Sequence, residues 1–220
     1  MAKVNAGKPL VIVGAGGHGR EVARMVEDIN RCSGEQWELL GFVDDSVQGE
    51  TVEGDRILGD VGSLVPMDTK PWVVCAIGNP RTRKRIATML EQAGLRFATL
   101  VHPSVVTSRF VTIGEGSMVS AGTILTTNIA IGRHCLINTG CRIGHDTRLG
   151  DYASLMIGVS IAGEVTVGSG CFLGLNACVI NRVSVGEWSI IGAGAAVVKD
   201  IPPRVVAVGV PATPIKTLDQ

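Results

Sequence analysis

The chain has 220 residues, with 20 basic and 20 acidic side chains and a formal net charge of zero. This balance gives no basis for binding nucleic acid or an anionic membrane, and no apolar run reaches the roughly 18 residues that a transmembrane helix needs. The opening sequence MAKVNAGKPL has no long apolar signal core, so we expect a soluble cytoplasmic protein. Glycine is abundant, at 29 residues, and aromatic residues make up only 4%, which suits tight, uniform coils.

The first part of the chain alternates between strand and helix patterns. Residues 10–19 (LVIVGAGGHG) read as an apolar strand that runs into a glycine-rich turn, and residues 20–29 place apolar side chains at helical spacing. Residues 39–46 (LLGFVDDS) read as a second strand that ends in two carboxylates, and residues 72–80 (WVVCAIGNP) as a third. Residues 81–94 read as a second helix. This alternation predicts a parallel sheet.

From about residue 101 the pattern becomes a repeat of six residues. Every sixth position from Ile113 to Val197 is aliphatic, fifteen in succession, which chance gives with odds below about one in a million. The position four residues after each aliphatic one is small in this series, Ile129 and the valines apart. A third position recurs every 18 residues and is always glycine: Gly114, Gly132, Gly150, Gly168 and Gly186.

The repeat predicts a triangular solenoid. Each hexad forms one side and one corner, the aliphatic side chain points inward, and the glycine permits the turn. Three hexads complete one coil, and coils stack at the strand spacing of about 4.8 Å. We therefore predict two domains: a small Rossmann-like α/β domain in residues 1–100, and a left-handed parallel β-helix with a C-terminal tail in residues 101–220.

The six cysteines are not spaced as a metal or redox motif requires, since no two of them form a C-x-x-C pair. We expect reduced thiols that are mostly buried as small apolar side chains. They are Cys32, Cys75, Cys135, Cys141, Cys171 and Cys178.

The hexads, the opening VIVGAGGHGREVA, the segments FVDD, AIGN and IGHD, and the ending VVKDIPPRVVAVGVPATPIK resemble the hexapeptide-repeat sugar acetyltransferases. Members of that family add acetyl groups to nucleotide-linked amino sugars or to sialic acid. The resemblance covers nearly the whole chain. It implies a Rossmann-like domain followed by a left-handed β-helix, acetyl-CoA as co-substrate, and a homotrimer.

The segment IGHD supplies the candidate catalytic residues. One coil period after His145 comes Gly163, which we expect to lie about 5 Å above it and to leave a backbone N–H open beside the imidazole. Acyl transfer needs this pair: a base, and a donor for the oxygen of the tetrahedral intermediate. The resemblance implies that His145 is the general base and that Asp146 tunes it. Sequence alone does not assure a direct contact between them, because neighbours on a strand face opposite sides.

The resemblance also implies the cofactor site, a cleft between neighbouring β-helices. Positions that match Gly163, Leu175 and Ala193 lie beside acetyl-CoA in the family. Many members carry a second histidine near the cofactor, nine residues after the first, where this chain has Ser154. A hydroxyl can replace a hydrogen bond there but not a titratable imidazole. Lys199 or Lys216 could meet the cofactor phosphates.

The glycine-rich turn formally fits the dinucleotide fingerprint G-x-G-x-x-G, so a nicotinamide cofactor has to be considered. Glycines at a helix N-terminus bind any phosphate, however, including the diphosphate of a nucleotide sugar. Asn79 follows a strand at its carboxyl end, where ligands of open α/β sheets bind. The resemblance implies that the positions lining the sugar-nucleotide site are Gly16, Gly17, His18, Asp44, Asp45 and Gly78.

The remaining polar features carry weaker signals. His102 and His134 read as surface or capping histidines, because their spacings do not match the coil and a trihistidine metal site with His145 is disfavoured. The run RTRKR at 81–85 reads mainly as a solvated helix face. We expect no metal.

The function expected is acetyl-CoA-dependent N-acetylation of the 4-amino group of a UDP-linked amino-deoxy sugar, with His145 as the base. The first alternative is O-acetylation of sialic acid or a related sugar. An NAD-dependent oxidoreductase with the β-helix as a stalk, and a non-enzymatic sugar-nucleotide sensor, are further alternatives. The sequence leaves open the sugar, its stereochemistry and the residues that bridge subunits.

Overall fold

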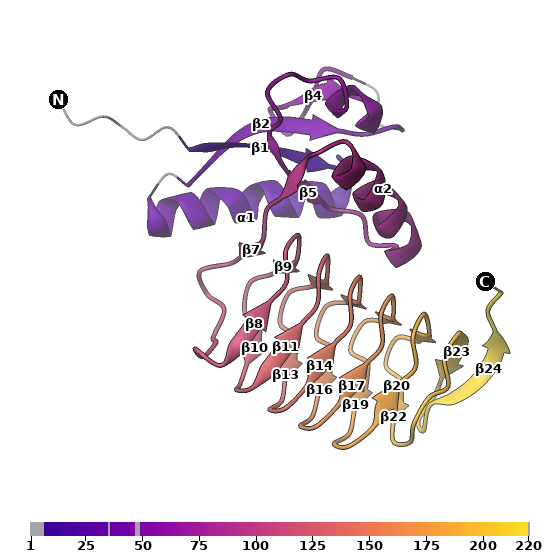
Figure 1. Ribbon diagram of the computed structural model, residues 1–220. Helices are drawn as coiled ribbons and strands as arrows, with labels where there is room; N and C mark the ends of the chain where they lie inside the picture. The colour runs from indigo at the N-terminus through magenta and orange to yellow at the C-terminus, as the bar shows by residue number, and fades with distance from the viewer. Residues whose placement is uncertain (1–6, 35, 47–48, 220) are drawn as a thin grey trace.

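The computed structural model describes residues 7–34, 36–46 and 49–219, so the two ends of the predicted domains, 1–6 and 220, lie outside it. The chain folds into a Rossmann-like domain that sits on the first coils of a parallel β-helix (Figure 1). This confirms the predicted fold class.

The N-terminal sheet has six strands in the order β3-β4-β2-β1-β5-β6. Strand pairs around β1, β2 and β5 are parallel, and only β3 and β4 pair antiparallel. The elements are β1 (Lys8–Val13), α1 (Gly17–Ser33), β2 (Trp37–Val43), β3 (Thr51–Val52), β4 (Asp55–Gly59), the short 3-10 helix η1 (Val61–Leu64), β5 (Trp72–Cys75), α2 (Pro80–Gln92) and β6 (Arg96–Phe97).

Helices α1 and α2 cover opposite faces of this sheet. Alternate residues of β1 show it: Leu10 and Ile12 pack in one core with α1, whereas Val11 and Val13 pack in another with α2. The core under α1 also contains Leu136 and other residues of the β-helix. Helix α1 therefore lies between the sheet and the first coils, as Figure 1 shows.

The β-helix has three sides, which we call side 1, side 2 and side 3. Side 1 faces the N-terminal domain and holds β7 (Leu100–Val101), β9 (Met118–Val119), β12 (Leu136–Ile137), β15 (Ser154–Leu155), β18 (Phe172–Leu173), β21 (Ile190–Ile191), β23 (Val205–Val208) and the antiparallel β24 (Thr213–Thr217). Side 2 holds β10 (Ile124–Leu125), β13 (Arg142–Ile143), β16 (Ser160–Ile161), β19 (Cys178–Val179) and β22 (Ala196–Val197). Side 3 holds β8 (Val111–Ile113), β11 (Ile129–Ile131), β14 (Arg148–Leu149), β17 (Thr166–Val167) and β20 (Ser184–Val185).

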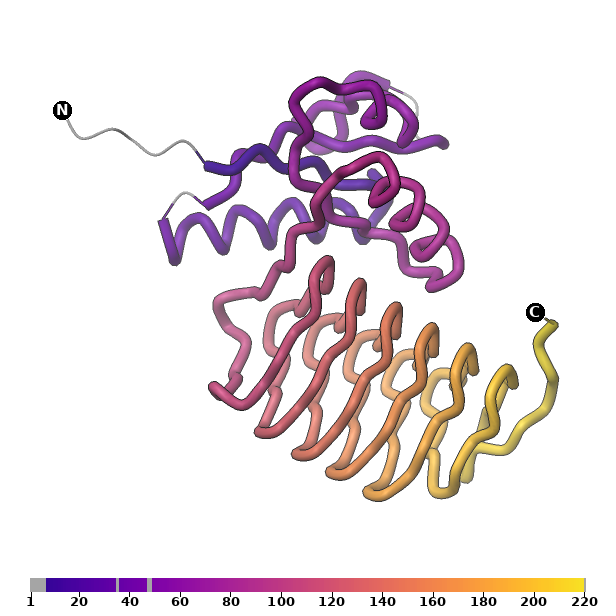
Figure 2. The backbone as a smooth tube through the Cα atoms, in the orientation of Figure 1, coloured from indigo at the N-terminus to yellow at the C-terminus, as the bar shows by residue number. Residues whose placement is uncertain are grey.

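The coils stack in the predicted register of 18 residues. Leu125 pairs with Ile143, and Ile143 pairs with Ile161. All fifteen aliphatic positions point into one core, with only Ile113 half-buried. Figure 2 shows the resulting ladder of coils running from the N-terminal domain to the C-terminus.

The recurring glycines do a different job from the one predicted. Gly168 and its equivalents do not have left-handed backbone angles. They are required because the next coil approaches closely: a Cβ on Gly168 would lie 2.5 Å from the backbone nitrogen of Glu187. The left-handed residues of the corners come elsewhere, and many are not glycine, for example Tyr152 (φ 62°) and Trp188 (φ 58°).

The cysteines follow the prediction that most are buried. Four are buried in the cores, whereas Cys32 on α1 and Cys178 on side 2 are exposed. Burial raises the pKa of Cys75 to about 12 and the pKa of Cys135 to about 11.

Candidate active site

His145 and Asp146 occupy the corner between side 2 and side 3, which we call the His145 corner. Asp146 has a left-handed backbone with φ of 59°. This conformation turns its side chain toward its neighbour, and Asp146 Oδ2 lies 2.7 Å from His145 Nδ1. The corner therefore supplies the contact that a regular strand would not allow.

Asn128 occupies the same corner one coil earlier. Its Nδ2 donates a hydrogen bond to Asp146 Oδ1, so the carboxylate is held from two sides. Hydrogen bonds first from His145 and then from Asn128 hold the pKa of the Asp146 carboxyl below its usual range. The sequence analysis missed Asn128, although the period of 18 residues places it next to Asp146.

Gly163 lies against the imidazole in the next coil, as predicted from the repeat. A Cβ on Gly163 would lie 2.5 Å from both Cε1 and Nε2 of His145, so no other residue fits while the ring stays in place. The N–H of Gly163 donates no hydrogen bond to any residue that the structure describes. The Nε2 side of the imidazole thus lies beside an unengaged backbone amide.

The glycine-rich turn between β1 and α1 contains two kinds of glycine. Gly14 has a φ of 101°, and a Cβ on Gly19 would clash with the carbonyl oxygen of Gly14, so the fold itself requires both. Gly16 and Gly17 are exposed, and a Cβ on Gly16 would meet no atom within 4 Å. Packing therefore does not explain Gly16 and Gly17, whereas the approach of a ligand to the N-terminus of α1 would.

The predicted polar residues of this edge are already used by the backbone. Asp44 Oδ2 accepts from the N–H of Ala15 at 2.7 Å, which fixes the glycine-rich turn to the end of β2. Asp45 Oδ1 accepts from the N–H of Val61 at 2.9 Å. Asn79 caps α2 by accepting from two backbone N–H groups, of which that of Arg81 is at 3.0 Å. Each of these side chains retains further hydrogen-bonding atoms.

His18 lies in the first turn of α1, where its Nδ1 is 3.1 Å from Glu21 Oε2. Its Nε2 is buried and has no hydrogen-bond partner among the described residues. It borders a cavity of about 250 Å³ between α1 and the first coils. His102 lines the same cavity and lies 3.2 Å from Asp28.

His134 is not the surface or capping histidine that was expected. It is fully buried, stacked on Tyr152 with ring centroids 5.0 Å apart, and its Nε2 lies 3.0 Å from Glu91 of α2. Burial lowers its pKa. His134 therefore belongs to the contact between the two domains. Among the described residues, no group of three His, Cys, Asp or Glu side chains is placed to hold a metal ion.

The prediction that Ser154 lies beside the cofactor is wrong for this chain. Ser154 points outward from side 1, and the N-terminal domain covers that point, so the hydroxyl is fully buried. Its Oγ donates to the carbonyl of Gly78 at 3.0 Å and accepts from Arg83 Nη2 at 2.8 Å. The hydroxyl is a fixed part of the domain contact.

Arg83 was grouped with a solvated helix face, but it is completely buried. Its guanidinium donates to the carbonyls of Ile77 at 2.6 Å and Tyr152 at 2.7 Å, and its Nε donates to that of His134 at 2.9 Å. Burial lowers its pKa, and no carboxylate faces it among these partners. Arg83 ties the loop after β5 to two successive coils.

Leu175 and Ala193 are stacked on the corner between side 1 and side 2, which we call the Leu175 corner. Both are exposed, and the N–H of Gly194 donates to the carbonyl of Leu175 at 2.8 Å. This is a different corner from that of His145 and Gly163. Within one chain the structure thus separates the predicted catalytic pair from Leu175, Ala193 and the glycine-rich turn.

Comparisons with known proteins fit this architecture. Residues 9–90 match a family model described as the PglD N-terminal domain, and residues 164–199 match one described as a hexapeptide repeat of succinyl-transferase. No helix in the described part of the chain is long and apolar enough to cross a membrane.

Two solved structures resemble nearly the whole chain. A mutant of perosamine N-acetyltransferase from Caulobacter crescentus, in complex with CoA and GDP-perosamine, is 35% identical with a TM-score of 0.85, over 94% of this chain and 96% of that one. The acetyltransferase domain of PglB from Neisseria gonorrhoeae, in complex with acetyl coenzyme A, is 28% identical with a TM-score of 0.88, over 96% and 100%.

Among curated proteins, GDP-perosamine N-acetyltransferase of Escherichia coli is 30% identical over 118 residues, 53% of each chain. The match thus spans about half the length of that relative. A β-helix that displays a histidine beside a glycine, joined to a Rossmann-like domain, defines a hexapeptide-repeat acyltransferase. The chain belongs to the family of hexapeptide-repeat sugar N-acetyltransferases.

Proposed function

We propose that this protein transfers an acetyl group from acetyl-CoA to the 4-amino group of a UDP-linked amino-deoxy sugar. The observation that carries the proposal is the imidazole of His145, held by Asp146 at 2.7 Å and facing the unengaged amide of Gly163. The relatives named above act on GDP-perosamine, and a further relative is UDP-N-acetylbacillosamine N-acetyltransferase of Bacillus subtilis, 35% identical over 122 residues.

The reaction is direct attack of the sugar nitrogen on the thioester carbonyl. As the C–N bond forms, the nitrogen loses a proton to Nε2 of His145, while Asp146 stabilises the imidazolium through Nδ1. The carbonyl oxygen becomes an oxyanion, to which the N–H of Gly163 donates a hydrogen bond. Collapse of the intermediate breaks the C–S bond, and the proton on the imidazole passes to the departing sulfur, which yields the amide and CoA.

The nucleotide sugar occupies the carboxyl edge of the N-terminal sheet in this proposal. Its diphosphate lies against Gly16 and Gly17, where the N-terminus of α1 favours negative charge. Asp45 is exposed and keeps oxygens free to accept hydrogen bonds from the base or the ribose. His18 and Gly78 border the same edge.

A complete site requires a second protomer. Side 2 and the Leu175 corner expose large apolar side chains, among them Ile180 (44%) and Leu175 (49%), which is unusual for a surface open to water. His145 is 56% exposed at the other border of side 2. We place the His145 corner of one protomer against the Leu175 corner and glycine-rich turn of its partner in a homotrimer. Acetyl-CoA then lies in the cleft between them, along Leu175 and Ala193.

An acceptor screen tests the proposal. The protein is incubated with acetyl-CoA and, separately, a UDP-linked 4-amino sugar, GDP-perosamine, a CMP-linked sialic acid and free sialic acid, and products are read by mass spectrometry. A gain of one acetyl group on the UDP-linked amino sugar is expected. Exclusive acetylation of sialic acid would favour O-acetylation instead. Binding of NAD(H) without any acetyl transfer would favour an oxidoreductase, and binding of the nucleotide sugar alone would favour a sensor.

A further inference from the structure

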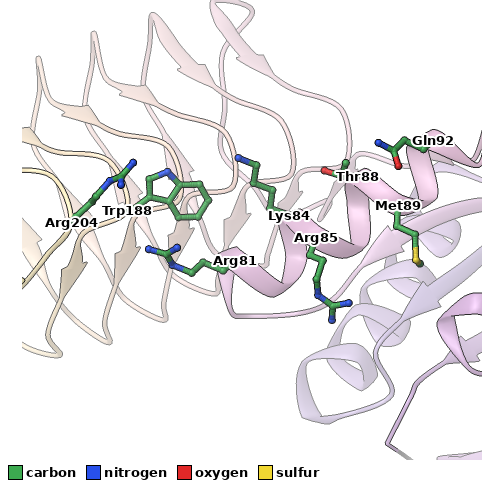
Figure 3. Close-up of a pocket in the computed structure, with 8 residues that line it drawn as sticks. All are labelled: Arg81, Lys84, Arg85, Thr88, Met89, Gln92, Trp188 and Arg204. Carbon is green, nitrogen blue, oxygen red and sulfur yellow. The ribbon is translucent and has the colours of Figure 1, made fainter. Parts of the chain in front are cut away.

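A second cavity, of about 550 Å³, lies where helix α2 meets the corner between side 3 and side 1. Figure 3 shows side chains from α2 on one wall and Trp188 and Arg204 of the β-helix on the other. Four cations line it, and no carboxylate does. None of the residues assigned to acetyl transfer takes part in the lining.

The indole of Trp188 forms a fixed wall of this cavity. Trp188 takes a left-handed corner position, and its ring lies over Gly170, where any Cβ would clash with it. Two cations are held against the ring: the guanidinium carbon of Arg81 lies 5.3 Å from the ring centroid, and Nζ of Lys84 lies 5.1 Å from it. Cation–π attraction thus keeps both heads at the cavity.

The positive charge of this cavity has no adequate balance within the chain. Arg81, Lys84 and Arg85 share one face of α2 at spacings of three and four residues, where like charges repel. They lie near the N-terminus of the helix, whose dipole disfavours cations, and its first turn holds no acidic residue. Among the described residues, Lys84 and Arg85 form no ion pair, and Arg204 has only Glu187 at 3.5 Å.

We propose that this cavity binds the phosphate groups of a small phosphorylated molecule. Arginine offers planar pairs of donors that match phosphate oxygens, and a doubly charged anion would offset the repulsion among the four cations. A volume of about 550 Å³ is in the range of small-molecule sites. The site is separate from the acetyl-transfer site, so its occupancy does not depend on the proposed reaction.

Calorimetric titration of the full-length protein at physiological salt tests this site. Inorganic pyrophosphate and ADP are the probes, titrated separately, because tighter binding of ADP identifies a nucleoside phosphate and equal binding identifies the inorganic anion. The test variant is Lys84→Gln with Arg204→Gln, which removes one cation from each wall. The matched control is Arg96→Gln with Arg109→Gln, since both arginines also stack on aromatic rings, at 4.5 Å and 4.8 Å, but elsewhere.

The proposal expects saturable binding of one anion per chain. The dissociation constant should rise at least about tenfold in the cavity variant, as expected for lost charge-assisted hydrogen bonds, and stay unchanged in the control. Both variants change exposed or half-buried residues, and an unchanged melting temperature verifies that they fold. Absence of saturable binding of either probe, or equal weakening by both double variants, would overturn the proposal.

Discussion

Nδ1 of His145 lies 2.7 Å from Oδ2 of Asp146, although the two residues are adjacent in sequence. The left-handed backbone of Asp146 makes this contact possible, and Asn128 from the preceding coil fixes the other carboxylate oxygen. The low pKa of the Asp146 carboxyl means that it stays ionised well into the acidic range. The imidazole is therefore oriented by a permanent negative charge that the coil itself holds in place.

Loss of this orientation should slow the chemistry without disturbing assembly. We expect Asp146→Asn to lower kcat by about 10- to 100-fold, because the imidazolium loses its counter-charge. Asn128→Ala should lower kcat by about three- to tenfold, the value of one hydrogen bond. Steady-state kinetics at saturating acetyl-CoA measure both effects. Arg182→Ala, at the same corner two coils beyond Asp146, is the control, and a loss as large as that of Asn128→Ala would contradict the assigned role.

The glycine-rich turn allows a test that separates binding from folding. Gly17→Leu adds a side chain where only the end of Arg20 lies near, at 3.9 Å, so the melting temperature should hold. It should raise KM for the nucleotide sugar at least about tenfold by blocking the phosphates, and leave KM for acetyl-CoA unchanged. Gly19→Ala should instead lower the melting temperature, because its Cβ meets the carbonyl of Gly14. An unchanged nucleotide-sugar KM in Gly17→Leu would place the acceptor elsewhere.

Much of this architecture could be predicted from the sequence because it repeats. The period of 18 residues gave the stacking of Gly163 on His145 and the buried positions of the core. The repeat could not place the N-terminal domain on side 1, because that contact depends on single long side chains. Arg83 and Ser154 therefore read as surface residues, yet both are buried in the domain contact. The role of the period-18 glycines was wrong for a similar reason, since close approach of coils is not visible in a one-dimensional pattern.

Arg83 should be a principal determinant of the domain contact. Arg83→Met leaves the carbonyls of Ile77, Tyr152 and His134 without their donors in a buried position. We expect a loss of about 3 kcal/mol of stability, which corresponds to a melting temperature lower by about 6–12 °C. Differential scanning calorimetry measures it, with the exposed Arg85→Met as the control. Equal melting temperatures for both variants would show that the guanidinium does not hold the domains together.

The thiols report on the proposed subunit contact. Burial keeps Cys75 and Cys135 protonated, with pKa values of about 12 and about 11, so they should not react with a thiol reagent at pH 8. Cys32 should react quickly. Cys178 is exposed in the single chain but lies on side 2, so it should be protected in the trimer and react on dissociation. Fast labelling of Cys178 in the intact trimer, read by peptide mass spectrometry, would rule out side 2 as the contact.

The role of His145 is the centre of the account, and one measurement tests it most directly. The rate of acetyl transfer from acetyl-CoA to the nucleotide-linked amino sugar is compared between the wild type and His145→Ala, with the oligomeric state of both determined in the same samples. A general base predicts a loss on the order of 10²-fold or more with the assembly retained. A near-wild-type rate in an intact assembly would contradict the role assigned to His145.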